Sequence, residues 1–177
     1  MPKKIILRAP EPSDVDRIYL WENNPEMWPC GAFRAPLSRH QIWEYVNNYD
    51  ANPLSGGQLR LIIEAGADEE GEGYTPCGIV DLYDIDPRDS RAFVGIMVAP
   101  DFRRKGIAAE ALAQLEKYCR ECLALRLLAA EVASDNQRSI RLFGGAGYLL
   151  VGRRPAWFRR GAEFISCAQF QKELISM

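Results

Sequence analysis

Short apolar runs separated by turn residues recur along the chain, and two kinds of period can be distinguished in them. Runs of strand length, rich in Val, Ile and Leu, predict strands at residues 3–9, 58–65, 77–85, 92–98, 125–132, 148–151 and 163–172. Apolar residues spaced three and four apart predict four helices, which begin near Ser13, Ser38, Ala108 and Asn136. Ser13 with Asp16, and Ser38 with Gln41, are spaced like the two residues of a capping box.

The order of these elements indicates a mixed α/β sheet in one domain over residues 1–177. Strands 58–65, 77–85 and 92–98 follow one another through turns, so we expect an antiparallel meander. The helix that starts near Ala108 then makes a crossover, which places strand 125–132 parallel to strand 92–98. Residues 153–161 are expected to be a connection that contains Trp157, Phe158 and four arginines.

Composition narrows the class of protein. The chain has 177 residues, 47% of them hydrophobic, which suits one domain with a sizeable core. Lys and Arg number 22 against 24 Asp and Glu, and the net charge of −2 argues against a general nucleic-acid partner. No apolar stretch approaches a membrane span, and the apolar run after Lys4 is too short for a signal peptide. We therefore expect a soluble, cytoplasmic protein without a membrane partner.

Cysteine and histidine offer little chemistry of their own. The five cysteines are an odd number scattered along the chain, which favours reduced thiols over a disulfide framework. Cys119 and Cys122 form a C-x-x-C pair, but no second pair completes a zinc site, so we expect both in the core and no metal. His40 is the single histidine, has no nucleophile motif beside it, and is expected on a helix surface.

The turn after strand 92–98 has the character of an anion site. Pro100 cannot donate to a sheet ladder, so the strand must stop or splay there. Three consecutive cations follow, and then Gly106 precedes a long helix whose first N–H groups point back at the turn. This arrangement suits a phosphate. Composition alone leaves a second interpretation open, in which the cations are only a solvated helix start.

Two segments carry a family resemblance. Residues 98–108, Val-Ala-Pro-Asp-Phe-Arg-Arg-Lys-Gly-Ile-Ala, resemble the acetyl-CoA signature of the GNAT acetyltransferases, a Gln/Arg-x-x-Gly-x-Gly/Ala turn that follows a strand. Residues 136–148, from Asn136 to Tyr148, resemble the family's second segment, Asn-x-x-Ala/Ser followed by an apolar position and Gly-Phe/Tyr, at the usual spacing. The resemblance implies a mostly antiparallel seven-stranded sheet with a central splayed parallel pair, and acetyl-CoA as cosubstrate.

The resemblance also assigns roles to residues of the cofactor site. The pantetheine arm is expected between the splayed strands, where the backbone N–H of Met97 or Val98 would polarise the thioester carbonyl. The pyrophosphate is expected on main-chain N–H groups of the turn formed by Arg103, Arg104, Lys105, Gly106, Ile107 and Ala108. Asn136 is expected to bind a pantetheine amide. A plain helix N-cap is the alternative for Asn136, and one side chain can serve both roles.

The acid and base of the reaction are less defined. Many relatives carry a tyrosine where this chain has Phe143, which has no proton to give, so we nominate no general acid. Strand 92–98, where some relatives carry a catalytic glutamate, has no carboxylate. The nearest carboxylates by topology are Asp81 and Asp84, which strand alternation places on opposite faces. Asp81 is the candidate base, and a structural or surface aspartate is the alternative.

The acceptor is left open among three hypotheses. The chain resembles the branch of the family that contains spermidine N-acetyltransferases and ribosomal-protein N-terminal acetyltransferases, which implies a small amine or a peptide N-terminus as substrate and allows a homo-oligomer. A polyamine site is expected to use carboxylates and aromatic faces, for which the candidates are Glu22, Trp28, Phe33 and Asp84. A peptide site would instead use the arginines of residues 153–160. The third hypothesis is a non-catalytic acetyl-CoA-binding subunit.

Overall fold

The computed structural model describes residues 4–27, 35–49, 52–66 and 73–174. The chain divides into two compact units, Ala9–Ala51 on the one hand, and Met1–Arg8 with Asn52–Met177 on the other. Trp28 and Phe33, two of the expected substrate-binding residues, lie outside the described residues. The remaining expected site residues belong to the larger unit, except Glu22.

The smaller unit contains three helical segments, η1 (Pro12–Asp14), α1 (Val15–Glu22) and α2 (Arg39–Asn47). The predicted capping pair of Ser13 and Asp16 is wrong: the capping box lies at η1, between Glu11 and Asp14, and the Asp14 carboxylate accepts the Glu11 N–H at 2.8 Å. The predicted capping box of Ser38 and Gln41 is confirmed at the start of α2.

The larger unit is built on one seven-stranded sheet with the strand order β1-β2-β3-β4-β5-β7-β6. Every neighbouring pair is antiparallel except β4 and β5, which are parallel, and this confirms the predicted meander and crossover. The strands are β1 (Ile5–Arg8), β2 (Leu59–Gly66), β3 (Tyr74–Asp86), β4 (Arg91–Val98), β5 (Leu127–Ala133), β6 (Leu149–Arg160) and β7 (Glu163–Glu173).

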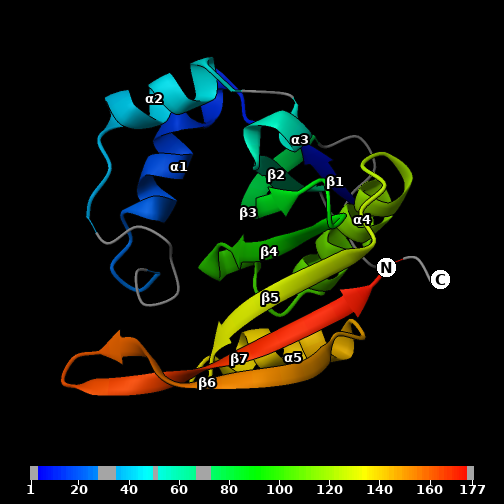
Figure 1. Cartoon of the computed structure of the whole chain (residues 1–177). Coiled ribbons are helices and arrows are strands. Elements are labelled where there is room, and N and C mark those ends of the chain that lie inside the picture. The colour runs from blue at the N-terminus through cyan, green and yellow to red at the C-terminus, as the bar shows by residue number, and fades with distance from the viewer. Residues whose placement is uncertain (1–3, 28–34, 50–51, 67–72, 175–177) are drawn as a thin grey trace. The chain divides into compact units, whose positions relative to one another are not determined.

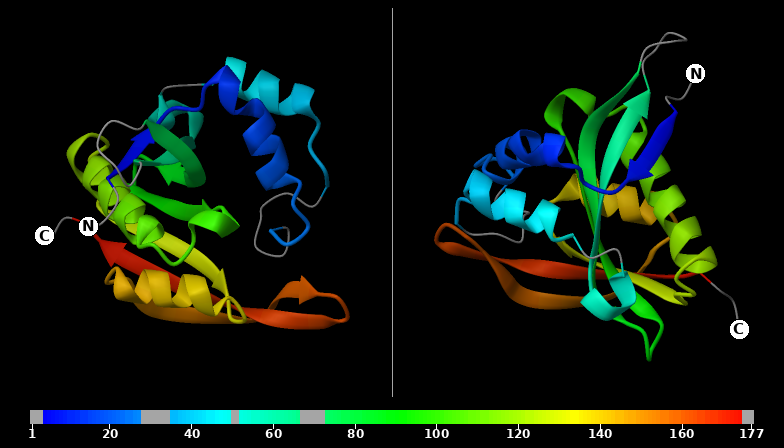
Figure 2. Two further views of the ribbon diagram at one scale, coloured as in Figure 1. Left: turned by 180° about the vertical axis from the view of Figure 1, so that it is seen from behind. Right: turned by 90° about the horizontal axis from the view of Figure 1, so that it is seen from above.

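Helices α4 and α5 cover one face of this sheet, as both views of the ribbon show (Figures 1 and 2). The helical segments of this unit are α3 (Pro53–Gly56), η2 (Pro100–Phe102), α4 (Ile107–Glu121) and α5 (Gln137–Gly145). The short α3 was not predicted, because its Pro-Leu-Ser-Gly sequence has too few residues to show a period. None of the helices in the described part of the chain is long and apolar enough to cross a membrane.

The apolar stripe of α4 forms the centre of the core on this face. Ile107, Ala111, Leu112, Leu115 and Cys119 are buried, as their spacing of three and four predicts. Cys122 is exposed, so the expectation that both cysteines of the C-x-x-C pair lie in the core is wrong for this residue. It follows the last residue of α4, where the helix ends and the stripe no longer faces the sheet.

A part-buried ion pair joins α4 to β7. Lys172 of β7 pairs with Glu116 of α4 and also donates to the carbonyl of Ala146 at 2.7 Å. One carboxylate oxygen of Glu116 and the hydroxyl of Tyr148 are buried without a hydrogen-bond partner in the described structure. Lys172 therefore shows that its face of β7 is the one that packs against the helices.

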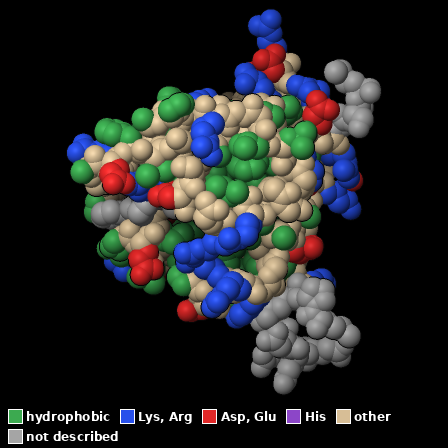
Figure 3. Space-filling model, turned by 90° about the horizontal axis from the view of Figure 1, so that it is seen from below, with side chains coloured by type: hydrophobic (Ala, Val, Ile, Leu, Met, Phe, Trp, Pro, Cys, Tyr) green, Lys and Arg blue, Asp and Glu red, His purple; other side chains and the backbone are tan. Residues whose placement is uncertain are grey.

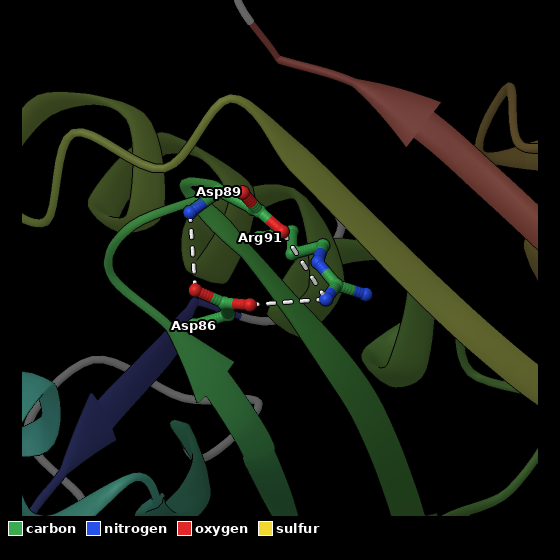
Figure 4. Close-up of polar contacts among 3 residues, drawn as sticks. All are labelled: Asp86, Asp89 and Arg91. Atoms are coloured by element: carbon green, nitrogen blue, oxygen red, sulfur yellow. Dashed lines mark hydrogen bonds and ion pairs between the residues drawn. The ribbon is translucent and has the colours of Figure 1, made fainter.

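A polar turn fixes the register between β3 and β4 (Figure 4). The Asp86 carboxylate accepts the Asp89 N–H at 3.0 Å and an Arg91 N–H at 3.0 Å. The Asp89 N–H, followed by Arg91, holds the pKa of the Asp86 carboxyl below its usual range. Two residues of β3, at positions 84 and 85, lie opposite a single residue of β4 in this register, which is a β-bulge.

The β6–β7 hairpin extends much further than the sequence suggested. Residues 153–161, predicted to be a connection, continue β6 as far as Arg160, and the chain turns at Gly161 with φ +61°. The prediction failed because Pro155 and consecutive arginines hide the alternation, and the register indeed shifts between Arg154 and Phe158. Figure 3, a view from the side of β6, shows basic side chains beside hydrophobic ones on this face.

Candidate active site

The parallel strands β4 and β5 separate in the middle of the sheet. They pair only at Arg91–Leu127, Ala92–Leu128 and Phe93–Ala129. Beyond Phe93 the strands diverge, while β4 stays paired with β3 and β5 with β7 (Figure 1). The splay therefore begins five residues before the end of β4 and not at Pro100, where the sequence placed it. The result is a gap bordered by backbone groups of residues 94–98.

The register determines which N–H groups face this gap. Ala99 donates its N–H to the Cys77 carbonyl at 2.8 Å, so Ala99 is directed toward β3. Backbone groups alternate in direction along an antiparallel strand, which turns the Met97 N–H toward β3 and the Val98 N–H toward the gap. The Val98 carbonyl, which accepts from Arg103 Nε at 2.9 Å, is likewise not used by β3. Of the two expected oxyanion donors, the geometry thus favours Val98.

β3 packs closely against β4 next to Val98, on the β4 side of the gap. Gly78 lies opposite Val98, and a Cβ at Gly78 would collide with the Met97 carbonyl. The absence of a side chain at Gly78 is therefore what lets the two strands approach here.

The turn after β4 leads directly into the N-terminus of α4. Gly106 is the N-cap with φ +77°, and Arg104 also has a positive φ of 62°. Lys105 Nζ donates to the Asp101 carbonyl at 2.9 Å, and Arg103 is held by Val98. Because Gly106 has no capping side chain, the first N–H groups of α4 face the turn together with the positive end of the helix dipole. Main-chain groups at Ile107 and Ala108 can bind an anion there.

Asn136 follows β5, and this places it at the same edge of the sheet as the N-terminus of α4. It is the N-cap of α5, where its side-chain oxygen accepts the Ser139 N–H at 3.2 Å. The carboxyl ends of parallel strands meet at one edge, so the N-termini of α4 and α5 both begin beside the gap. The capping role of Asn136 is therefore confirmed, and its contact with pantetheine stays a prediction.

Asp81, the candidate base, is held by an arginine. Its two carboxylate oxygens accept from Nε and Nη2 of Arg60, both at 2.8 Å, across the neighbouring strands β2 and β3. Such a bidentate pair fixes the geometry of both side chains and occupies the carboxylate. The contacts favour a structural role for Asp81 over the role of general base.

The other expected substrate-binding residues belong to different parts of the chain. Asp84 is exposed, lies in the β3 bulge and has a positive φ of 47°. Glu22 is the last residue of α1, in the smaller unit. Trp28 and Phe33 are outside the described residues.

Phe143, which stands where many relatives have a tyrosine, belongs to an aromatic core cluster. It is 3% exposed and contacts Tyr148 edge-on at a centroid distance of 5.1 Å and Phe170 at 6.2 Å. Its side chain is fixed among these rings, so no polar group at this position can protonate a leaving thiolate.

Two polar residues near the gap were missed by the sequence reasoning, Glu131 of β5 and Tyr83 of β3. Glu131 pairs with Arg154 of β6. Burial, followed by the charge of Glu131, raises the pKa of Tyr83 to about 12, so its hydroxyl keeps its proton at neutral pH. Glu131 is the single charged residue of β5, Leu-Leu-Ala-Ala-Glu-Val-Ala, and that isolation was the available signal.

Known proteins share two features with this chain: a sheet with one splayed parallel pair of strands, and a helix that begins beside the splay. The model of the acetyltransferase (GNAT) domain family matches residues 4–148, so the chain belongs to the GNAT acetyltransferase family. A curated protein of Bacillus subtilis, named "Putative ribosomal N-acetyltransferase YdaF", is 32% identical over 91 residues. That match spans 51% of this chain and 48% of the relative, about half the length of each.

Solved structures share the fold over nearly the whole chain. Spermidine N-acetyltransferase from Vibrio cholerae, in complex with CoA and spermine, aligns with a TM-score of 0.82 over 96% of this chain and 95% of that one, at 21% identity. A dodecameric structure of the Vibrio cholerae enzyme in an intermediate state aligns with a TM-score of 0.77 over 96% and 94%, also at 21% identity. These likenesses establish the GNAT fold of this chain.

Proposed function

We propose that this protein transfers an acetyl group from acetyl-CoA to a primary amine, by direct attack of the amine on the thioester, and that the amine is a polyamine such as spermidine. The observation that carries the proposal is the gap between β4 and β5, which has an N–H of Val98 on its border and the N-terminus of α4 at its end. Family membership supports the reaction class. The neighbour solved with CoA and spermine supports the choice of acceptor.

The residues of the gap suit acetyl-CoA. The pyrophosphate would be held by main-chain N–H groups at Gly106, Ile107 and Ala108, with the cations of the turn around it. The bound thioester supplies an already activated acyl group. The Val98 N–H would stabilise the negative charge that develops on its carbonyl oxygen during attack. No acid is required in this account, because a thiol with a pKa of about 8.5 leaves readily as the thiolate.

A second acceptor, the N-terminus of a protein or peptide, is favoured by one observation. The curated relative, at 32% identity over 91 residues, is named as a ribosomal N-acetyltransferase. The arginines that a peptide site would use are partly engaged, since Arg154 pairs with Glu131 and Arg160 with Asp135. These pairs leave less positive charge for a peptide than the sequence suggests, so the polyamine is the first candidate.

The proposal is tested by release of the CoA thiol from acetyl-CoA with a panel of amines. The panel contains spermidine, spermine, putrescine and short peptides that begin with Ser or Ala. We expect saturable release with the polyamines and background release with the peptides. Release with the peptides alone would transfer the proposal to the second acceptor. Binding of acetyl-CoA, seen as a raised melting temperature, with no release for any amine would refute catalysis and favour an acetyl-CoA-binding subunit.

A further inference from the structure

The side of the sheet that faces away from α4 and α5 has its own polar groups beside the gap. Lys172 contacts Glu116 of α4, and Phe170 stacks on Phe143 of α5, so these two residues of β7 mark the helix-covered face. Leu128 lies opposite Lys172, and Glu131 lies opposite Gln169 in the β5–β7 register. Because side chains alternate along a strand, Glu131 is on the face opposite to the one that α4 and α5 cover.

Glu131 and Gly95 border the gap on this face. Phe93 and Ala129 are the last paired residues of β4 and β5, and the next positions on the same face are Gly95 and Glu131. Gly95 contributes no side chain. Among the described residues, only the Tyr83 ring comes within 4 Å of a Cβ built there, at 3.8 Å, so these residues leave room for a side chain at this position. The carboxylate of Glu131 thus stands on one side of the gap, and Gly95, which has no side chain, on the other.

Tyr83 completes the surroundings of that space. It lies on the same face, opposite Phe93 in the β3–β4 register, and stacks on the Phe93 ring at a centroid distance of 5.6 Å. Burial raises the pKa of Tyr83 most, and the charge of Glu131 contributes, in agreement with the shared face that the registers give to these two residues. An aromatic ring and a carboxylate from different strands therefore flank the same opening.

One oxygen of Glu131 is available to a ligand. Oε1 accepts from Arg154 Nη1 at 2.5 Å, and Oε2 makes no hydrogen bond within the described parts of the chain. Arg154 holds the Glu131 side chain in place. This side chain is 22% exposed, so it is still accessible from solvent. A positioned carboxylate with one unused oxygen, on the same face of the sheet as an aromatic side chain, is a combination that suits an ammonium group.

We propose that Glu131 binds the ammonium group of the acceptor, with Tyr83 beside it and the space over Gly95 for the adjoining carbon chain. This inference rests on the proposed function, because it names the acceptor subsite of the same reaction. The amine would reach the thioester from the face opposite α4 and α5, while the N-terminus of α4 holds the pyrophosphate. Because Arg154 positions the Glu131 carboxylate before the amine binds, less ordering is needed on binding. Glu131 would then determine specificity for charged amines.

The test compares Glu131→Gln with wild type in steady-state kinetics on spermidine, or on the most active amine of the panel. We expect the KM for the amine to rise at least tenfold, with kcat within twofold. The melting-temperature shift caused by acetyl-CoA should stay unchanged. Calorimetric titration of spermidine into the protein with CoA bound should show the same loss of affinity without turnover.

The matched control is Glu173→Gln, which removes another carboxylate of the same face. Glu173 is paired with Arg126 at 3.4 Å, where β5 and β7 are fully paired. We expect wild-type kinetics from it.

Two further variants separate binding from a structural role. Gly95→Val fills the space beside Tyr83 and should raise the KM for the amine as Glu131→Gln does. Arg154→Gln keeps the carboxylate but removes the contact that positions it, so the KM for the amine should rise only a fewfold, clearly less than in Glu131→Gln. A wild-type KM in Glu131→Gln would overturn the inference, as would an Arg154→Gln variant that loses as much affinity as Glu131→Gln. A wild-type protein that binds acetyl-CoA and acetylates no amine would instead refute the proposed function.

Discussion

Arg60 and Asp81 form a two-point ion pair across β2 and β3, with both N–O distances at 2.8 Å and side chains 17% and 28% exposed. The pair holds the strand that supports β4, so its main effect should be on stability. We predict that Asp81→Asn lowers the free energy of unfolding by about 1–2 kcal/mol, because a half-buried guanidinium loses its partner. Urea denaturation measures this change.

The same variant decides whether Asp81 is the general base. Loss of a general base costs about 10²- to 10⁴-fold in rate, whereas loss of a structural pair leaves kcat and its pH profile in place. We expect kcat of Asp81→Asn to remain within a fewfold of wild type below its melting temperature. A hundredfold loss of kcat in a folded variant would restore Asp81 as the base.

The backbone N–H of Val98 can be removed without changing its side chain. Replacing this residue by its α-hydroxy acid converts the amide to an ester, which has no N–H. We predict a loss of about 10²-fold or more in kcat with little change in stability, because this N–H faces the gap and not β3.

The equivalent ester at Met97 is the control for that experiment. The Met97 N–H belongs to the β3–β4 ladder, so its loss should cost about 1 kcal/mol of stability and leave kcat nearly intact. If the two esters exchanged these effects, the assignment of Val98 as the donor would be wrong.

Gly106 sets the direction of the turn at the start of α4. Its φ is +77°, and a Cβ there would meet nothing within 4 Å, so Gly106→Ala is penalised by backbone conformation alone. We predict a loss of about 1 kcal/mol in stability and weaker acetyl-CoA binding, measured by calorimetry.

Gly144→Ala in α5 is the control. A Cβ at Gly144 would also meet nothing within 4 Å, but this residue has no positive φ, so the variant should be neutral or stabilised by about 0.5–1 kcal/mol. Equal effects of the two variants would contradict this account of the turn.

Burial raises the pKa of the Cys119 thiol from 9.0 to about 12, with a further contribution from Glu116. Between these values the folded protein keeps a proton that the unfolded chain releases, so unfolding is favoured as the pH rises. We predict that stability falls between about pH 9 and pH 12 and that Cys119→Ala reduces this slope. Urea melts at pH 8, 9 and 10 measure it. An unchanged slope in the variant would show that other groups, such as Tyr83, carry the effect.

Much of the fold could be predicted from local pattern. The long period of α4 and the turns between β2, β3 and β4 are properties of neighbouring residues, and these elements were predicted correctly. The distal half of β6 was not, because its pairing depends on β7 and its own sequence contains Pro155 and a run of arginines. Cys122 was placed in the core by its spacing, but the helix ends just before it.

The cofactor side of the site was readable from the sequence, and the acceptor side was not. The turn from Arg103 to Ala108 is contiguous, and its phosphate-binding character follows from residues next to one another. Glu131, Tyr83 and Gly95 come from three strands, and they share a face only through the registers of β3, β4 and β5. The choice between Met97 and Val98 likewise depends on one hydrogen bond of Ala99, which spacing does not reveal.

The most direct test of the central claim is to follow the acetyl group itself. The protein is incubated with isotope-labelled acetyl-CoA and spermidine, and the amine is analysed by mass spectrometry. We predict that spermidine gains a single labelled acetyl group, that CoA thiol appears in equal amount, and that the ester at Val98 slows both by about 10²-fold or more. CoA binding without any acetylated spermidine or acetylated peptide would contradict the assignment of this protein as an N-acetyltransferase.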